Sequence, residues 1–139
     1  MTRRRRRRAA WSCYRGVAGR YLYTNGEIGV NPDGAQCVNV LNTYWASLGI
    51  PSRFGNAGDW VGRPTRYLRW LPSTPGVRVV AGDAACISAS GAYPNGHVAL
   101  VLDGSETPLV VMGQNSPTGT PCQLAGMNPY EIAGYLRPV

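Results

Sequence analysis

The chain is organised around the segment Asp33-Gly34-Ala35-Gln36-Cys37-Val38-Asn39-Val40-Leu41-Asn42-Thr43-Tyr44-Trp45. Its first two residues favour a turn, and an apolar pattern of helical period follows at once. Four apolar residues recur at spacings of three and four, which predicts a shared buried face made of Val38, Leu41, Trp45 and Leu48. We therefore expect a helix from about residue 36 to residue 48, which ends at Gly49.

Cys37 falls in the first turn of this expected helix. Unpaired backbone N–H groups and the positive end of the helix dipole lie there, and both favour a thiolate. A thiol in this position is expected to have a lowered pKa and to be a good nucleophile at neutral pH. An isolated cysteine can also be a buried structural residue, and this segment alone leaves both interpretations open.

The length and charge of the chain predict one folded domain that carries a basic arm. The chain has 139 residues, 18 of them Gly and 11 Pro, which is typical of a domain with short elements and many turns. Six of the 14 basic residues form the run from Arg3 to Arg8, so eight basic residues remain against seven acidic ones. Residues 1–10 are predicted to be a flexible arm, because like charges repel, and residues 11–139 the domain.

The cysteines do not have the spacing of a metal site. Cys13, Cys37, Cys86 and Cys122 form no C-x-x-C pair, and the sequence has a single histidine, so a zinc site is not expected. Cys86 lies in an apolar stretch and is predicted simply to pack. The sequence leaves open whether Cys13 and Cys122 are bridged.

The second half of the chain has the pattern of strands. Apolar runs separated by turn signals predict strands at residues 77–80, 84–88, 97–102, 109–112 and 132–136. Helical segments therefore come first and an antiparallel sheet second, which is the α+β class. Between the halves, Trp60 lies in a glycine-rich segment that lines a substrate site or is a connector with a packed indole.

His97 begins the most apolar of these runs. If the following hairpin is symmetrical about Glu106, Leu102 pairs with Val110 and His97 with Asn115, whose side chains would then be neighbours on one face. The Asn115 amide would fix one imidazole nitrogen while the other faces a thiol. This is the Cys–His–amide arrangement of nucleophilic catalysis.

Five short pieces, in this order and spacing, make the chain resemble the CHAP domain over roughly residues 20–137. They are Asp33-Gly34-Ala35-Gln36-Cys37-Val38, Gly55-Asn56-Ala57-Gly58-Asp59-Trp60, Gly82-Asp83, Gly96-His97-Val98-Ala99-Leu100-Val101 and Gln114-Asn115. The resemblance implies a papain-like α+β fold, with N-terminal helices packed on a C-terminal antiparallel sheet. It also implies cleavage of bacterial peptidoglycan, by an N-acetylmuramoyl-L-alanine amidase or a peptide endopeptidase.

The resemblance also implies roles for particular residues. Cys37 is expected to be the nucleophile and His97 the general base. The family often has Glu in the place of Gly113, so the orienting role would pass to Asn115. Oxyanion binding or contact with substrate is expected of Gln36, Trp60 and Gln114. Some relatives hold calcium near the Gln-Cys pair, but Asp33 is the only carboxylate there, so neither a metal nor another cofactor is expected.

The expected partner is bacterial peptidoglycan. The run from Arg3 to Arg8 would contact an anionic wall polymer or a membrane, or be a solvated tail with no partner. Specific nucleic-acid binding is not expected, because aromatic residues do not alternate with the arginines. The alternatives to a lytic enzyme are a virion component with the same fold and an inactive wall-binding module.

The sequence also leads to expectations about where the protein is located and how it assembles. No apolar stretch of seven or more residues follows the arginine run, so no export signal is expected, and no segment approaches transmembrane length. The protein is therefore expected in the host cytoplasm until its release to the wall, or in the virion. We expect a monomer unless it is virion-associated.

Overall fold

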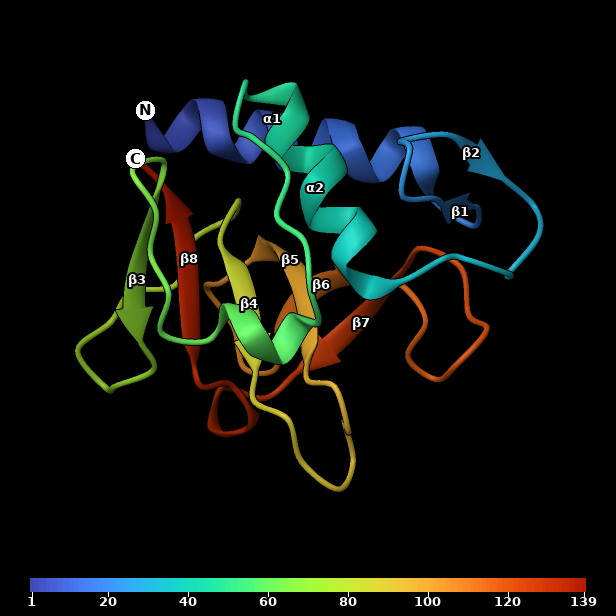
Figure 1. Ribbon diagram of the computed structural model, residues 1–139. Coiled ribbons are helices and arrows are strands. Elements are labelled where there is room, and N and C mark those ends of the chain that lie inside the picture. Colours follow the sequence, from blue (N-terminus) through green and yellow to red (C-terminus); the bar gives the residue numbers. More distant parts are fainter.

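The computed structural model describes residues 1–139. Two α-helices precede most of the strands, and two short 3-10 helices lie in connections (Figure 1). The elements in the first half are α1 (Arg3–Val17), β1 (Tyr21–Leu22), β2 (Ile28–Gly29), α2 (Cys37–Ser47), η1 (Ala57–Trp60) and β3 (Leu68–Pro72). Those in the second half are β4 (Ala84–Ile87), β5 (His97–Asp103), β6 (Leu109–Gly113), β7 (Gln123–Met127), η2 (Pro129–Glu131) and β8 (Gly134–Pro138).

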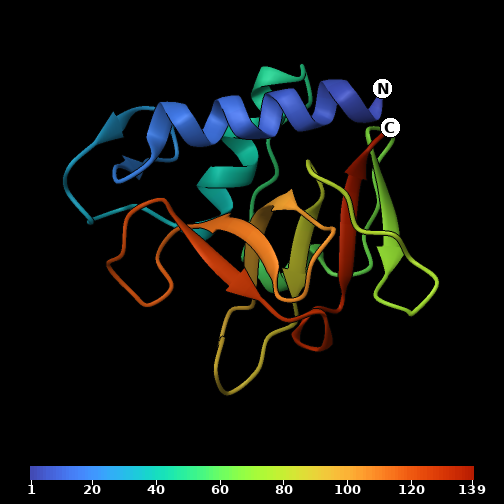
Figure 2. The ribbon, with the colours of Figure 1, turned by 180° about the vertical axis from the view of Figure 1, so that it is seen from behind.

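The six longer strands form one sheet in the order β3-β8-β4-β5-β6-β7, and every neighbouring pair is antiparallel. β1 and β2 form a separate small hairpin. Residues of both helices pack in the core on one face of the large sheet, and α1 runs along the top of the molecule in the views from the front and from behind (Figures 1 and 2). The predicted α+β fold, with N-terminal helices on a C-terminal antiparallel sheet, is confirmed. No helix is both long and apolar enough to cross a membrane.

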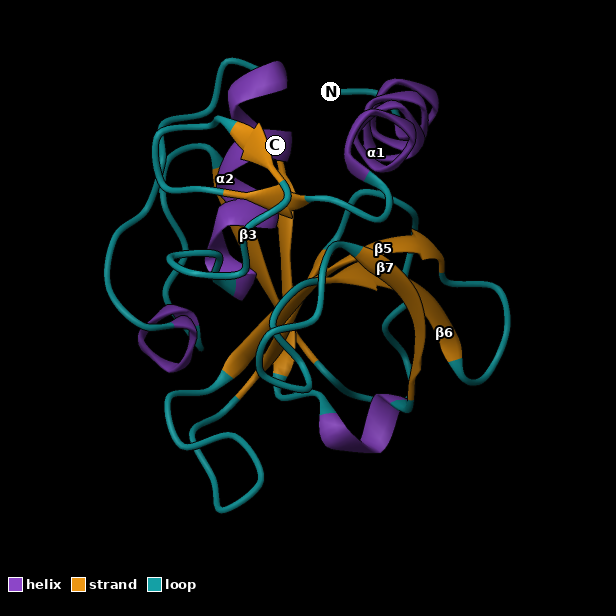
Figure 3. Cartoon of the chain, turned by 90° about the vertical axis from the view of Figure 1, so that its right-hand side faces the viewer, coloured by secondary structure: helices purple, strands orange, loops and turns teal.

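Two apolar cores lie on opposite faces of the sheet, because successive side chains of a strand point to opposite sides. Along β5, Val98 and Leu100 pack toward the helices, whereas Ala99 and Val101 belong to the core on the other face. The strands β5, β6 and β7 curve around this second core, which η2 closes from below in the side view (Figure 3). β5 is therefore the central element, because its side chains contribute to both cores.

The arginine run is helical, whereas the sequence predicted a flexible arm. Thr2 caps α1 by accepting a hydrogen bond from the N–H of Arg5 at 3.1 Å, and Ala10 and Val17 are buried in the main core. The Trp11 indole donates to the Leu102 carbonyl at 3.1 Å and fastens the helix to β5. Arginine is a good helix former, and tertiary packing of this apolar face outweighs the repulsion between like charges.

The buried face of α2 differs from the predicted one. It is made of Val40, Leu41, Tyr44 and Trp45, whereas Val38 and Leu48 are only half-buried. The helix is enclosed by β5 on one side and α1 on another, so its buried face is wider than a single apolar stripe and rotated from it. Asn39 is also buried, because its side chain donates to the Leu22 carbonyl at 2.9 Å.

One strand prediction was wrong, and two strands were not predicted. Residues 77–80 are not a strand, whereas β3, which pairs with β8, and β7, which pairs with β6, were not predicted. The expected hairpin register holds where Val101 pairs with Val111, but a bulge then places Asp103, rather than Leu102, opposite Val110.

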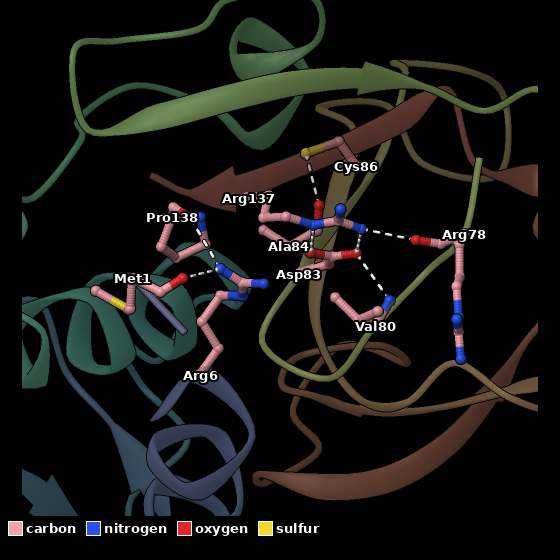
Figure 4. Close-up of polar contacts among 9 residues, drawn as sticks. All are labelled: Met1, Arg6, Arg78, Val80, Asp83, Ala84, Cys86, Arg137 and Pro138. Atoms are coloured by element: carbon pink, nitrogen blue, oxygen red, sulfur yellow. Dashed lines mark hydrogen bonds and ion pairs between the residues drawn. The ribbon is translucent and has the colours of Figure 1, made fainter. Parts of the chain in front are cut away.

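A buried ion pair ties the loop that precedes β4 to the last strand, β8 (Figure 4). The Asp83 carboxylate is fully buried and accepts two hydrogen bonds from the Arg137 guanidinium, at 2.7 and 2.9 Å. It also accepts from the N–H of Val80, while Arg137 donates to the Arg78 carbonyl. The Gly82-Asp83 pair therefore has a structural role. The Asp83 carboxylate holds residues 77–80 as a loop, where the sequence predicted a strand.

Candidate active site

A cleft of about 430 Å³ opens at the first turn of α2. Four segments line it: residues 36–38, 56–57, 92–97 and 115–118. Four of the predicted site residues, Gln36, Cys37, His97 and Asn115, therefore meet in one place although they lie far apart in the sequence. Trp60 and Gln114 do not line this cleft.

Cys37 is the first residue of α2, as predicted, and its side chain is half-buried. The predicted lowering of its pKa is not found. Burial raises the pKa of the thiol, and backbone hydrogen bonds from Val98, Val38 and Cys37 itself oppose that effect only in part. The interaction with Val98 places the sulfur beside the start of β5, next to His97.

His97 lies at the first position of β5 and is 5% exposed. Burial lowers the pKa of its imidazole to about 4, because the charged form loses its hydration. The chain reaches this position through Gly96, whose φ is +76° and whose added Cβ would collide with the backbone of Gly58 and with the Ile87 carbonyl. Glycine is thus required immediately before the histidine.

The imidazole of His97 has an aromatic neighbour that was not predicted from the sequence. The Tyr93 ring stacks on it with centroids 5.2 Å apart and planes inclined by 13°. Nε2 faces Gly113, where an added Cβ would lie 3.6 Å from that nitrogen. Burial is the only cause of the imidazole pKa shift, and no protein group is hydrogen-bonded to the ring. The only signal in the sequence was that Tyr93 precedes His97 by four residues.

Asn115 lines the cleft, but the predicted hydrogen bond to His97 is absent. β6 ends at Gly113, so the register does not extend to Asn115. Asn115 adopts a left-handed φ of 62° and its side-chain oxygen accepts from the N–H of Gly119 at 2.8 Å. The side chain therefore closes the turn that follows β6, a common use of asparagine in this conformation.

Gln114 was predicted to contact substrate and is instead fully buried. Its side chain accepts from the N–H of Leu22 at 2.7 Å and donates to the carbonyl of Leu22 at 3.0 Å and to that of Gln36 at 2.8 Å. The thiol of Cys122 also donates to its oxygen at 3.3 Å. Gln114 is thus an internal clamp between β6, β1 and the residue that precedes Cys37.

Trp60 was the other predicted substrate-lining residue, and it belongs to the core. It is 1% exposed, packs against Trp45 at 5.2 Å between ring centroids, and donates from its indole to the Phe54 carbonyl. Arg53 covers the outer face of its ring. Of the two interpretations, the packed indole is the one found.

The remaining titratable groups do not gather at the cleft. All four cysteines are free, and Cys86 is buried in the core as predicted. No three His, Cys, Asp or Glu side chains converge anywhere in residues 1–139 in a way that could hold a metal ion. The cleft thus presents one thiol and one imidazole among uncharged side chains.

A family model described as "CHAP domain" matches residues 7–115, which is most of the chain and includes Cys37, His97 and Asn115. The chain belongs to the CHAP domain family. The match begins inside α1, so this family model includes part of the arginine run. No curated protein gives a significant sequence match.

Solved structures share the fold of this CHAP chain. The endolysin LysIME-EF1 superposes with a TM-score of 0.76 at 20% sequence identity, over 95% of this chain and 63% of that one. Ly7917, solved with the hydrolysing product of MDP, superposes with a TM-score of 0.68 at 12% identity, over 95% of this chain and 62% of that one. The CHAP chain therefore spans a little under two-thirds of the length of each.

Proposed function

We propose that the chain is a cysteine-dependent peptidoglycan hydrolase, an N-acetylmuramoyl-L-alanine amidase or a peptide endopeptidase. The observation that carries the proposal is the cleft in which Cys37, at the start of α2, meets His97, at the start of β5. Membership of the CHAP family and the fold shared with an endolysin support a wall substrate. In this proposal Asn115 shapes the cleft wall and does not orient the imidazole.

The pKa values favour a neutral pair at rest. Burial raises the pKa of the Cys37 thiol and lowers that of His97 to about 4, so at pH 7 the sulfur holds its proton and the imidazole is a free base. The imidazole takes the thiol proton as the sulfur attacks the amide carbonyl, and a carbon–sulfur bond forms. When the carbon–nitrogen bond breaks, the imidazolium gives this proton to the leaving amine.

The second half of the reaction returns the enzyme to its first state. Water attacks the thioester while His97 accepts one of its protons, and the carbon–sulfur bond breaks. The carboxylic product leaves, and the imidazolium returns its proton to the sulfur of Cys37. Each step therefore uses the same imidazole, first as base and then as acid.

The negative oxygen of each tetrahedral intermediate needs donors at the first turn of α2. The N–H of Cys37 is one candidate. Its peptide unit is fixed because the Gln36 carbonyl on the other side accepts from Gln114, and the two groups of a trans peptide point in opposite directions. The Gln36 side chain makes no capping bond and lies exposed at the cleft, so it is the second candidate.

The test is digestion of purified sacculi. Cys37→Ala should abolish the loss of turbidity, whereas Cys13→Ala, which removes a half-buried thiol on α1, should leave it unchanged. A new N-terminus at L-Ala identifies an amidase, and one at a cross-bridge residue identifies an endopeptidase. Dissolution of sacculi by Cys37→Ala at the full rate contradicts the proposal. Binding of sacculi by the unmodified chain without any cleavage favours an inactive wall-binding module.

We also propose that α1 contacts an anionic wall polymer through its arginine face, defined as Arg3, Arg4, Arg5, Arg7 and Arg8. All five are exposed, and none of their side chains forms a hydrogen bond or an ion pair with another residue. Arg6 differs, because its guanidinium turns inward and donates to the Met1 and Pro138 carbonyls.

The arginine face suits a phosphate-bearing wall polymer better than a membrane. The apolar residues of α1 face the core, so the exposed surface offers charge and little that would insert into lipid. Guanidinium groups bind phosphate oxygens in a bidentate geometry. Part of the face lies beside Ser47 and Leu48, at the opposite end of α2 from Cys37, so a bound polymer leaves the cleft open.

A further inference from the structure

The His97 ring has no hydrogen-bonding partner to set its orientation. Nε2 faces Gly113, which has no side chain, and the Asn115 oxygen is engaged by Gly119. An imidazole that exchanges protons with a thiol must nevertheless be held in one plane, since a misplacement of about 1 Å costs roughly 100-fold in rate. Another group must therefore supply this constraint.

Tyr93 is the group in contact with the face of the ring. The two rings are nearly parallel, with centroids 5.2 Å apart, which is an offset-stacked geometry favoured by aromatic pairs. Tyr93 is half-buried against the core on the far face of the sheet, so its own ring is not free to turn. The stack therefore defines the plane in which the imidazole lies.

The backbone around Tyr93 is fixed as well. Its N–H donates to the Ser90 hydroxyl at 3.3 Å, and its carbonyl accepts from the N–H groups of Ser90 and Gly96 at 2.8 and 2.9 Å. The Asn95 carbonyl accepts from the N–H of Gly58, which ties the same loop to η1. Loop and strand thus hold Tyr93 and His97 as one unit.

We propose that Tyr93 is the positioning residue of His97, and that ring stacking replaces a hydrogen-bonded orienter in this protein. The stack fixes the ring plane without occupying either ring nitrogen. It adds no negative charge, so the imidazole remains a neutral base at pH 7. The rate part of this inference rests on the proposed hydrolase function, whereas the orientation of the ring does not.

The sequence contains a single histidine, so NMR signals of imidazole report on His97 alone. The experiment compares the unmodified chain with Tyr93→Ala, with Tyr93→Phe, which keeps the aromatic face, and with Tyr130→Ala. Tyr130 is 85% exposed on η2 and is the matched control. Two quantities are measured: the His97 pKa by NMR titration, and kcat and KM on soluble peptidoglycan fragments.

Tyr93→Ala should lower kcat by about 10- to 100-fold with KM within about threefold, because general-base catalysis is lost when the ring turns. The His97 pKa should rise from about 4 toward 6.5, because the ring also loses cover. Tyr93→Phe should restore most of kcat and a pKa close to that of the unmodified chain. Tyr130→Ala should match the unmodified chain in both measurements.

Unchanged kcat and unchanged His97 pKa in Tyr93→Ala would overturn the proposal. A Tyr93→Phe variant as slow as Tyr93→Ala would also overturn it, because the hydroxyl would then be the active part. If Tyr93→Ala does not fold, Tyr93→Leu keeps the apolar volume without the aromatic face and should behave as Tyr93→Ala was expected to. If the unmodified chain cleaves no fragment, the hydrolase proposal fails. The NMR titration then tests the contact between the two rings, and an unchanged His97 pKa in Tyr93→Ala would still overturn the positioning role.

Discussion

The side-chain nitrogen of Gln114 lies 2.8 Å from the carbonyl oxygen of Gln36, and this hydrogen bond joins the end of β6 to the first turn of α2. The same side chain binds both backbone groups of Leu22. A residue 78 positions away in sequence thereby sets the peptide unit that carries the Cys37 N–H. Fold and site therefore depend on one buried amide.

Replacing Gln114 by Leu should damage both stability and rate. It leaves the buried N–H of Leu22 without a partner, whereas the Leu22 carbonyl still accepts from the Asn39 side chain, so we expect a loss of about 1–3 kcal/mol in the free energy of unfolding. kcat should fall more than KM rises, because the Cys37 N–H loses its orientation. Urea unfolding and fragment kinetics measure the two effects. Gln123→Leu, at an exposed position of β7, should change neither, and equal effects of the two variants would refute the clamp.

Lowering the pH should reduce the stability of the fold, because His97 titrates differently in the folded and the unfolded chain. The pKa of this group is about 4 in the folded protein and 6.5 when solvated, so the unfolded chain binds more protons between these values. Stability is therefore complete above about pH 6.5 and declines as the pH falls toward 4, by up to about 3 kcal/mol.

The variant His97→Gln isolates this contribution. The difference in unfolding free energy between the unmodified chain and His97→Gln should shift in favour of the variant as the pH falls from 6.5 to 4. Denaturant titrations at several pH values measure it. A difference that does not vary with pH would mean that the imidazole titrates alike in both states.

Gly113→Glu should raise the pKa of His97. The added Cβ makes only ordinary contacts, 3.6 Å from Nε2 and 4.0 Å from the Ala99 Cβ, so the side chain can be accommodated. A carboxylate beside the imidazole favours its charged form and should raise the pKa by about 1–3 units. The acidic limb of the kcat/KM profile, expected near pH 4, should move upward with it. Gly76→Glu adds the same charge at an open, exposed position and should leave the limb unmoved.

Asp83→Ala should be among the most destabilising single changes. It leaves the Arg137 guanidinium without its carboxylate in a largely buried place, and breaking such a pair costs about 3–5 kcal/mol. Glu106→Ala removes an exposed carboxylate from the hairpin turn and should cost almost nothing. Thermal unfolding of the two variants compares them. Similar melting temperatures would show that the ion pair does not stabilise the fold.

Wall binding should depend on the arginine face and on salt. Changing its five arginines to Gln should abolish binding to sacculi at low ionic strength, and the difference should vanish in about 1 M salt, where the screening length is near 3 Å. Cleavage of soluble fragments should persist, because the face lies away from the cleft. The matched control carries the same charge loss at Arg20, Arg63, Arg66, Arg69 and Arg78. Undiminished binding of the α1 variant, or equal binding to sacculi stripped of phosphate polymers, would contradict the proposal.

The sequence alone determined the features that depend on short stretches of chain. Helical period with a preceding turn located α2 and placed Cys37 at its start, and an apolar run located β5 with His97 at its first position. Helices followed by strands established the α+β class, and five short motifs were sufficient to indicate the family. These signals are local, because period, turn residues and caps act within a few positions.

The tertiary structure alone decided which side chains face the cleft and which face the core. Trp60 and Gln114 are buried by partners far away in sequence, and the arginine run is helical because α1 packs on α2 and β5. The bulge in β5 and the early end of β6 separate Asn115 from His97 and leave Tyr93 as the neighbour of the imidazole. Such outcomes depend on how distant segments pack against one another, and no local pattern in the chain records them.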